Sequence, residues 1–304
     1  MQEVVLKQVE YKNYKECVKL DNGIVDVVIT VSVGPRIIRY GFIGQCNELC
    51  DDAPMTLPVL DDEWRLMGGH RLLHSPEEFP RTYEPDNDAV RCEEIQNGLR
   101  VIYEQKKIAN IKKVMEITLF PGEARVQVLH KLINENAWAI RTAPWACTVM
   151  AMGGTVIIPF APEAGHFKNG ATNARYATIW SYTELSDKRL RWGKKFVTIE
   201  GDAKSKKNLK VGFSNRAGWC GYIRGEHLFT VKAAYIHNAE YPDNGCSCEV
   251  FTCDFMSEIE TLGPYTMLNP KEETTHIEQW NLIENVCLAS LNDGEVDEMV
   301  EKYI

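Results

Sequence analysis

The sequence predicts an all-β fold in which one large antiparallel β-sandwich or barrel takes up the whole chain, residues 1–304. A dozen short segments carry β-branched or alternating apolar residues, and Gly, Asn, Asp or Pro separates each from the next. Many short strands without intervening helices are typical of sandwiches and barrels, and 44% apolar residues suffice for a sizeable core. Because no linker or short repeat interrupts this pattern, we expect a single domain.

The strand candidates follow one another along most of the chain. The first half contains four, at residues 24–33, 99–105, 114–120 and 124–134. Eight more follow, in GTVIIPF, KKFVTIEG, LKVGFS, GWCGYIR, HLFTVKAAYI, CEVFTC, SEIETL and THIEQWNLI. His130 alternates with Val126 and Val128, so we expect it to be a core histidine. Only the tail from Gly294 has helical spacing, and Asp293 is its expected N-cap.

Charge and composition exclude several classes of function. The formal net charge is −9, from 34 basic and 43 acidic residues, which disfavours binding to nucleic acid. The one basic cluster, residues 204–207, is typical of an exposed turn. The N-terminus is charged from its third residue, and no segment has the roughly 18 consecutive apolar residues of a membrane span. We therefore expect a cytoplasmic protein that binds neither nucleic acid nor membrane.

The ten cysteines do not form a recognisable metal-binding or disulfide pattern. In the cytosol we expect them to remain thiols. The tightest group, Cys246, Cys248 and Cys253, lacks the matched C-x2-C pairs that zinc sites prefer. We expect no metal.

Residues 67–87, MGGHRLLHSPEEFPRTYEPDN, combine glycines, histidines, arginines, carboxylates and prolines without apolar periodicity. Long loops of this composition are usually functional, so we interpret the segment as a binding loop that forms one wall of a cleft. Its side chains that could contact a ligand are His70, Arg71, His74, Arg81, Tyr83 and Asp86.

Three acidic residues near the C-terminus need a compensating partner. Glu258 and Glu260 are two residues apart, so they lie on the same face of a strand. If residues 248–252 pair with this strand through a two-residue turn, Glu249 lies opposite Glu258, whereas a four-residue loop places it opposite Glu260. Like charges on one face require a cation, a ligand or a raised pKa, unless the face is simply solvated. Lys232, in an apolar strand, is the expected cationic partner.

Several segments together resemble the galactose mutarotase-like superfamily. They are LDNGIVDVVITVSVGPRIIRYGF, GGHRLLHSPE, YEPDN, YTELSDKRLRWG, YPDNGCSCEV and SEIETLGPYTMLNPKEETTHIEQWNL, in an order that covers about residues 20–282. The resemblance implies a large twisted β-sandwich (a supersandwich) with a carbohydrate site on its concave face and no organic cofactor.

The resemblance also implies roles for individual residues. Aldose 1-epimerases of this superfamily use a glutamate as base on the anomeric hydroxyl and a histidine as acid on the ring oxygen. By position the base resembles Glu260, with Glu258 as the alternative, and His70 resembles the first of two site histidines. The segment of the acid histidine, TAPWACTVMAMGG, contains Trp145 and no histidine. Its candidate substitutes are Lys232, His74 and His237.

These observations lead to three hypotheses about function. The first is an aldose 1-epimerase-like enzyme that interconverts the anomers of a small carbohydrate, with Trp145 and Tyr83 stacking on the sugar. The second is a non-catalytic carbohydrate-binding or sensing protein, and the third is a lyase or hydrolase that uses Glu258 and Glu260. The sequence leaves open which sugar is bound and how many subunits assemble.

Overall fold

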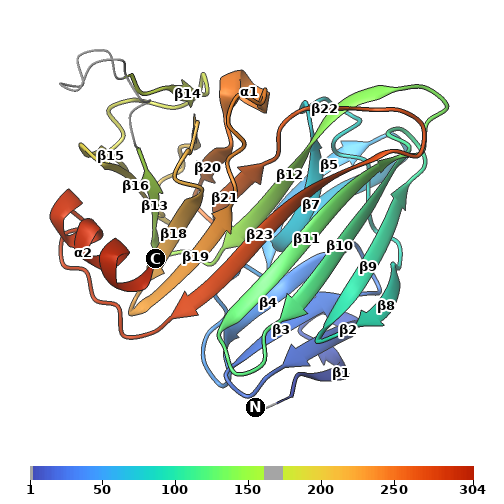
Figure 1. Cartoon of the computed structure of the whole chain (residues 1–304), viewed down its shortest axis with the longest axis horizontal. Coiled ribbons are helices and arrows are strands. Elements are labelled where there is room, and N and C mark those ends of the chain that lie inside the picture. Colours follow the sequence, from blue (N-terminus) through green and yellow to red (C-terminus); the bar gives the residue numbers. More distant parts are fainter. Residues whose placement is uncertain (1–2, 161–173) are drawn as a thin grey trace.

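Two large antiparallel sheets make up most of the computed structural model, which describes residues 3–160 and 174–304 (Figure 1). The first sheet runs in the order β1 (Val5–Tyr11), β2 (Tyr14–Asp21), β3 (Val25–Thr30), β4 (Arg36–Phe42), β7 (Gly69–Ser75), β12 (Ile140–Met150), β21 (Ser257–Leu262), β20 (Cys248–Thr252), β17 (Leu209–Phe213) and β14 (Ala177–Ile179), and β22 (Thr266–Leu268) pairs with β12. We call it the site sheet, because the candidate site lies on its outer face.

The second sheet faces the first. It runs in the order β15 (Leu190–Trp192), β16 (Phe196–Glu200), β13 (Thr155–Pro159), β18 (Trp219–Arg224), β19 (His227–Ala233), β23 (Glu273–Ile283), β11 (Arg125–Asn134), β10 (Ile111–Leu119), β9 (Gly98–Gln105) and β8 (Arg91–Ile95). We call it the backing sheet. The expected all-β sandwich with a short C-terminal helix is therefore confirmed.

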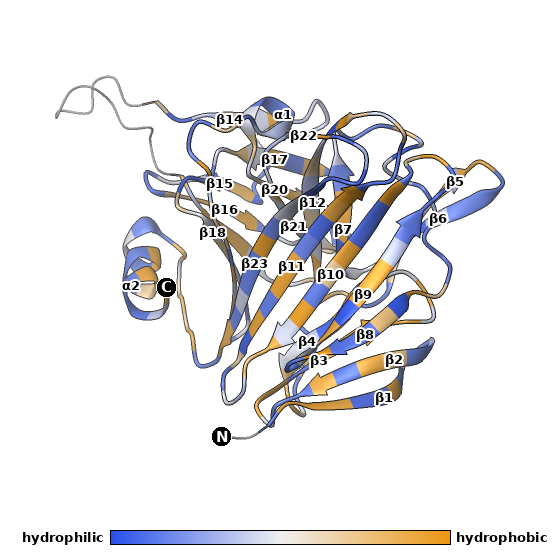
Figure 2. Cartoon of the chain, turned by 45° about the vertical axis from the view of Figure 1, so that its right-hand side comes forward, coloured by the Kyte–Doolittle hydropathy of each residue, from blue (hydrophilic) through white to orange (hydrophobic). Residues whose placement is uncertain are grey.

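Alternation of side chains explains why these segments form half-buried strands. In β11 every second residue is buried, from Val126 to Asn134, and the residues between them are only partly buried. Hydropathy stripes along the strands show the same period of two (Figure 2). Strands β7 and β12 are instead buried along nearly their whole length, because both of their faces are covered.

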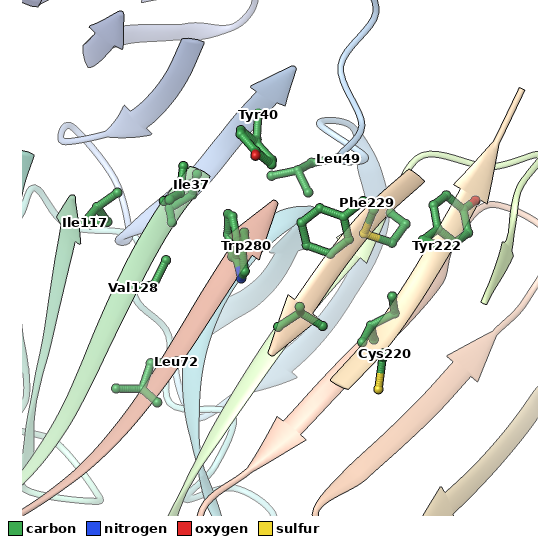
Figure 3. Packing of buried hydrophobic residues seen from close by; sticks show 14 of the residues in the cluster. Ile37, Tyr40, Leu49, Leu72, Ile117, Val128, Cys220, Tyr222, Phe229 and Trp280 are labelled. Atoms are coloured by element: carbon green, nitrogen blue, oxygen red, sulfur yellow. The ribbon is translucent and has the colours of Figure 1, made fainter. Parts of the chain in front are cut away.

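The main core lies between the two sheets. Figure 3 shows Tyr40 of the site sheet beside Phe229 and Trp280 of the backing sheet, and Leu72 and Val128 belong to the same core cluster. The rings of Tyr40 and Trp280 have centroids 5.8 Å apart, in a tilted arrangement. Aromatic packing of this kind joins the sheets across their inner faces.

Two smaller elements cover the outer faces of the sandwich. The hairpin of β5 (Ala53–Val59) and β6 (Asp62–Met67) packs on the site sheet through an apolar cluster that includes Trp64, Val149 and Met256. Helix α2 (Asp293–Tyr303) packs on the backing sheet through Val296 and Met299 (Figure 1). Its N-cap is Asn292 and not Asp293, because the Asn292 side chain accepts from the backbone N–H groups of Gly294 and Glu295. The other helical segment, α1 (Pro242–Gly245), spans four residues.

The segment at residues 67–87 is only partly a loop. Residues 69–75 form β7, which pairs with β4 and β12 in the middle of the site sheet. Gly69, at a φ of 68°, lets β7 close against β4, since a Cβ atom there would collide with the Ile37 carbonyl. The interpretation of the whole segment as a loop is therefore wrong for its first half.

Candidate functional site

One row of residues crosses the centre of the site sheet. The register pairs Arg71 with Cys147, Cys147 with Glu260, Glu260 with Glu249, and Glu249 with Gly212. All five therefore share the outer face. A Cβ atom at Gly212 would lie 2.5 Å from Cys246 Sγ and 3.2 Å from Glu249 Cγ, so the glycine leaves room for the buried carboxylate.

The hairpin that carries the acids follows one of the two predicted registers. Thr252 pairs with Ser257, so the loop between them has four residues and Glu249 lies opposite Glu260. Glu258, two residues before Glu260 in β21, lies on the same face and opposite Phe251. The prediction that these three acids share one face is confirmed, and they are buried instead of solvated, with at most 9% of each exposed.

A pocket of about 320 Å³ opens over these strands. Its aromatic lining residues are Trp64, Tyr83, Trp145, Trp180, Tyr182 and Phe251, and its charged ones are Arg71, Glu77, Lys210, Glu258 and Glu260. Concave sites that combine flat apolar surfaces with a few polar groups are typical of small-ligand sites. Strands of the site sheet supply many of these residues. Glu77 and Tyr83 come from the segment after β7, Trp64 from the β5–β6 hairpin, and Trp180 and Tyr182 from the segment after β14.

Lys210 is the cation that compensates the acids. Its Nζ lies 2.8 Å from Glu249 Oε2 and donates to Glu260 Oε2 over 2.8 Å. The same Glu260 oxygen accepts from Trp145 Nε1 at 2.7 Å. Burial alone would lower the pKa of Lys210, but the carboxylates of Glu260 and Glu249 hold that pKa well above its ordinary value. Lys210 therefore stays charged between them.

The prediction that Lys232 pairs with these acids is wrong. Lys232 lies in β19 of the backing sheet, is exposed, and donates to the carbonyl of Ile304 at 2.8 Å. Sequence reasoning missed Lys210, although the same argument applies to it. It alternates with the apolar residues Leu209 and Val211 in LKVGFS, so the strand period places its ammonium on the opposite face.

Glu258 differs from the other two acids because no ion pair fixes it. Burial, and then the charge of Glu260, raise its pKa from 4.5 to about 7, while Arg71 acts in the opposite direction. Its Oε1 is buried without a hydrogen-bond partner. A carboxyl that titrates near neutrality can donate or accept a proton at working pH.

Arg71 occupies the other end of the row. Its guanidinium stacks on the Trp64 ring, with Cζ 4.3 Å from the ring centroid, and only 3% of the residue is exposed. Nε and Nη1 are buried without hydrogen-bond partners. The Tyr83 hydroxyl donates to Glu77, and the Tyr83 ring packs edge-on against Trp64, with the ring centroids 5.1 Å apart.

His70 does not enter the pocket. It directly precedes Arg71 in β7, so its side chain lies on the inner face of the site sheet, where no part of it is exposed. His70 Nε2 lies 2.7 Å from His130 Nε2, and His70 Nδ1 lies 2.9 Å from Thr148 Oγ1. The implication that His70 contacts the sugar is therefore not supported by its position.

The hydrogen bonds of His70 and His130 determine their tautomers. His130 Nδ1 lies 3.0 Å from the His276 carbonyl oxygen, which can only accept. His130 Nε2 then accepts from His70 Nε2, and Thr148 donates to His70 Nδ1. Burial lowers the pKa of His130 to about 3 and that of His276 to about 4, so these rings are neutral. The expectation of a core histidine at position 130 is confirmed.

Glu278 completes this buried group, which we call the histidine layer: His70, His130, His276, Glu278, Thr148 and Thr261. Glu278 accepts from Thr261 Oγ1 and, at 2.8 Å, from Trp280 Nε1. Burial raises its pKa to about 7. Thr261 follows Glu260 in β21, so the layer lies directly behind the pocket, on the other face of the same strand.

Two groups in the described part of the chain bring metal-ligand atoms within 4.8 Å of one another. They are His70, His130 and Glu278, and Cys46, Glu48 and His227. In the first group the ring nitrogens and carboxylate oxygens are engaged as described above. In the second, Glu48 lies 2.6 Å from His227 Nδ1 and accepts from Arg224 at 3.0 Å. Because these hydrogen bonds already engage the atoms that would ligate a metal, neither group supports a metal site.

The remaining candidates lie outside the pocket. His74 is buried on the inner face of β7, and neither ring nitrogen has a hydrogen-bond partner. Asp86 pairs with Arg36 at 2.5 Å, and Arg81 donates to the Pro76 carbonyl. His237 is exposed and contacts the Tyr235 ring, with centroids 5.2 Å apart. The structure brings together Glu258, Glu260, Arg71, Trp145, Tyr83 and, behind Lys210, Glu249.

The comparisons with solved structures identify the fold. A putative aldose 1-epimerase from Escherichia coli matches 92% of this chain and 99% of its own, with a TM-score of 0.54 and 10% identity. The putative mutarotase YeaD from Salmonella typhimurium matches 92% of this chain and 94% of its own, with a TM-score of 0.57 and 8% identity. The chain has the galactose mutarotase-like fold. At these identities, the likeness concerns the fold alone.

A third solved structure matches this chain over only part of its own length. A TPR-domain containing protein from Parabacteroides distasonis matches 91% of this chain with a TM-score of 0.61 and 13% identity, and the chain covers 48% of it. This chain thus spans about half the length of that protein. No protein-family model matches the sequence, and no curated protein matches it. Neither helix of the described chain is long and apolar enough to cross a membrane.

Proposed function

We propose that the chain binds a small carbohydrate in this pocket and interconverts its anomers. The observation that carries the proposal is the pair Glu258 and Glu260, which face the same aromatic-lined pocket in different environments. Lys210 and Trp145 both donate to Glu260 Oε2 and leave Oε1 without a partner, whereas Glu258 titrates near neutrality. Two carboxyls with contrasting surroundings are the usual arrangement for acid and base roles.

In this mechanism Glu260 takes the proton of the anomeric hydroxyl while Glu258 gives its proton to the ring oxygen. The bond between C1 and the ring oxygen breaks, the open aldehyde rotates about C1–C2, and the proton transfers run in reverse on closure. Glu258 thereby takes the role of the histidine that is missing around Trp145. Trp145 and Trp180 offer flat faces for the apolar side of the sugar ring.

The test is exchange NMR between α and β anomers over a panel of neutral aldoses, uronic acids and sugar phosphates. We expect accelerated exchange for at least one sugar, loss of the acceleration in Glu260→Gln, and no change in Glu273→Gln, an exposed glutamate at the start of β23. General acid–base catalysis typically contributes about 10²–10⁴-fold, so the loss should be easily measured. If no sugar exchanges faster than without protein, the proposed reaction is wrong.

A second candidate function is carbohydrate binding without catalysis. It is favoured by the engagement of Glu260 Oε2 with two donors and by the position of His70 behind the sheet. Ligand line broadening without accelerated exchange would support it. The hypothesis of lyase or hydrolase chemistry at Glu258 and Glu260 predicts unsaturated or shortened products, which mass spectrometry of the same mixtures would detect.

A further inference from the structure

Arg71 is a buried cation that no carboxylate of the described residues contacts at ion-pair distance; Glu258 and Asp86 act on it only from farther away. Only 3% of the residue is exposed, and Nε and Nη1 have no hydrogen-bond partner. The other buried arginines of the described residues each have an aspartate partner: Arg36 pairs with Asp86 at 2.5 Å and Arg189 with Asp187 at 2.9 Å. Because burying an unpaired charge is costly, an arginine in this state is expected to receive its partner from a ligand.

The position of Arg71 relative to Glu260 indicates where that partner lies on the ligand. Both residues line the pocket, and the register places one strand, β12, between them. Two strand spacings separate their Cα atoms by about 10 Å. A hexose ring with its exocyclic carbon fits across this span, with the anomeric carbon at Glu260 and the opposite end at Arg71.

The other charges of the pocket leave Arg71 as the attachment point for an anion. Lys210 is held between Glu249 and Glu260, and Glu77 accepts from the Tyr83 hydroxyl. Glu258 has a pKa of about 7 and is therefore protonated in a large fraction of molecules at neutral pH. One uncompensated guanidinium matches one monoanion, and the planar fork of arginine matches a carboxylate in particular.

We propose that the pocket selects sugar acids, whose carboxylate, at the end of the sugar remote from the anomeric carbon, pairs with the guanidinium of Arg71. This inference rests on the proposed sugar site and narrows its substrate class. The contact with the Trp64 ring, whose centroid lies 4.3 Å from Cζ, restrains the orientation of the guanidinium plane. The carboxylate supplies the anionic partner that the buried arginine lacks.

Calorimetric titration with D-glucuronate, its methyl ester and D-glucose, and with the corresponding galactose series, tests the proposal. Wild type and Arg81→Met should bind at least one uronate about tenfold tighter than its methyl ester, and Arg71→Met should show no such preference. Arg81 is the matched control, because it lies outside the pocket lining and donates to the Pro76 carbonyl. Equal affinity of wild type for acid and ester in both series would overturn the proposal.

Two further arms keep the test decisive. Arg71→Lys retains the charge without the fork and should lose most of the uronate preference; an unchanged preference would overturn recognition by the fork. It also replaces Arg71→Met if that variant does not fold. Tighter binding of glucose 6-phosphate than of glucuronate would overturn the carboxylate assignment in favour of a dianion.

Failure of this inference and failure of the proposed reaction give different results. Uronate binding that depends on Arg71, without anomer exchange for any sugar, would leave the inference standing and refute the reaction. Accelerated exchange of neutral sugars with no preference for uronates would support the proposed reaction and refute the selection of sugar acids by Arg71.

Discussion

The two faces of strand β21 carry buried polar groups of opposite kinds. On the outer face of β21 and of its neighbour β20, Oε1 of Glu249, Glu258 and Glu260 lacks a hydrogen-bond partner although the residues are buried. On the inner face, the side-chain hydrogen bonds of the histidine layer form a closed set, and none of its atoms is among the buried unpartnered ones of the described chain. Buried polar groups are normally satisfied, so unpartnered atoms of residues that also line a pocket mark where a ligand is expected.

The comparison teaches that burial and altered pKa values do not locate a site by themselves. Glu258 and Glu278 both have pKa values raised to about 7 by burial. Glu278 has partners on both oxygens and lies between the sheets, whereas Glu258 lines a pocket with Oε1 unpartnered. Accessibility and unsatisfied bonding capacity separate the candidate site from the structural layer.

The largest effect is expected from Lys210→Met, which would leave two buried carboxylates facing each other across a strand pair. Removing one partner of a buried ion pair typically costs about 3–5 kcal/mol, and we expect a free energy of unfolding lower by that amount at pH 8. Denaturant titration measures it. Lys232→Met, the same change at an exposed site on the backing sheet, is the control and should change stability by less than about 0.5 kcal/mol. Similar losses in both variants would contradict the role of Lys210.

An intermediate effect is expected from His130→Leu in the histidine layer. The change leaves the His70 N–H and the His276 carbonyl without partners, at a cost of about 2–3 kcal/mol. The unfolded histidine titrates near 6.5 and folded His130 near 3, so its contribution to stability is present above pH 6.5 and is lost as pH falls.

The same variant should therefore lose stability less steeply than wild type between pH 6 and 4, by up to about 1.4 kcal/mol per pH unit. Unfolding curves recorded across this range provide the measurement. Anomer exchange, if present in wild type, should survive in the folded variant because His130 does not line the pocket. Selective loss of exchange at unchanged stability would break the division between the two faces.

The smallest effect, and one of opposite sign, is expected from Glu258→Gln. The carboxyl has a pKa of 4.5 when unfolded and about 7 when folded, so the folded state binds the proton more tightly. Its contribution to stability is present below pH 4.5 and is lost as pH rises through 7. Glu258→Gln should therefore be more stable than wild type at pH 8, by about 2 kcal/mol, and show little difference at pH 4.5.

Thermal and denaturant unfolding at the two pH values test this directly. A destabilised Glu258→Gln at pH 8 would show that the ionised carboxylate is satisfied in the folded protein, which would remove the distinction between Glu258 and Glu278. Under the proposed reaction the same variant loses anomer exchange, so gain of stability and loss of activity would occur together.

Much of the local arrangement could be predicted from alternation along single strands. The shared face of Glu258 and Glu260, the core position of His130 and the β character of most segments depend on neighbours in the sequence. The choice between Glu258 and Glu260 as the partner of Glu249 depended on the length of one loop, which patterns of propensity do not determine.

The wrong assignments share a cause. The family resemblance places His70 in the site and the apolar strand around Lys232 predicts an acidic partner for it, yet β7 places His70 on the inner face and β19 belongs to the other sheet. Trp64 reaches the pocket from the β5–β6 hairpin, Trp180 from the segment after β14, and Lys210 from β17. These segments are distant from Glu258 in the sequence, so no local signal connects them with it.

By itself the sequence determined the all-β class, the strand period and the presence of three acids that need a partner, because these follow from side-chain chemistry and a backbone repeat of two residues. Only the tertiary structure decided which cation compensates the acids, which face of β7 meets the pocket and that Arg71 has no ion-pair partner among the described residues. The physical reason is that strand order and sheet pairing are set by contacts between distant segments, whose free energies no short stretch of sequence contains.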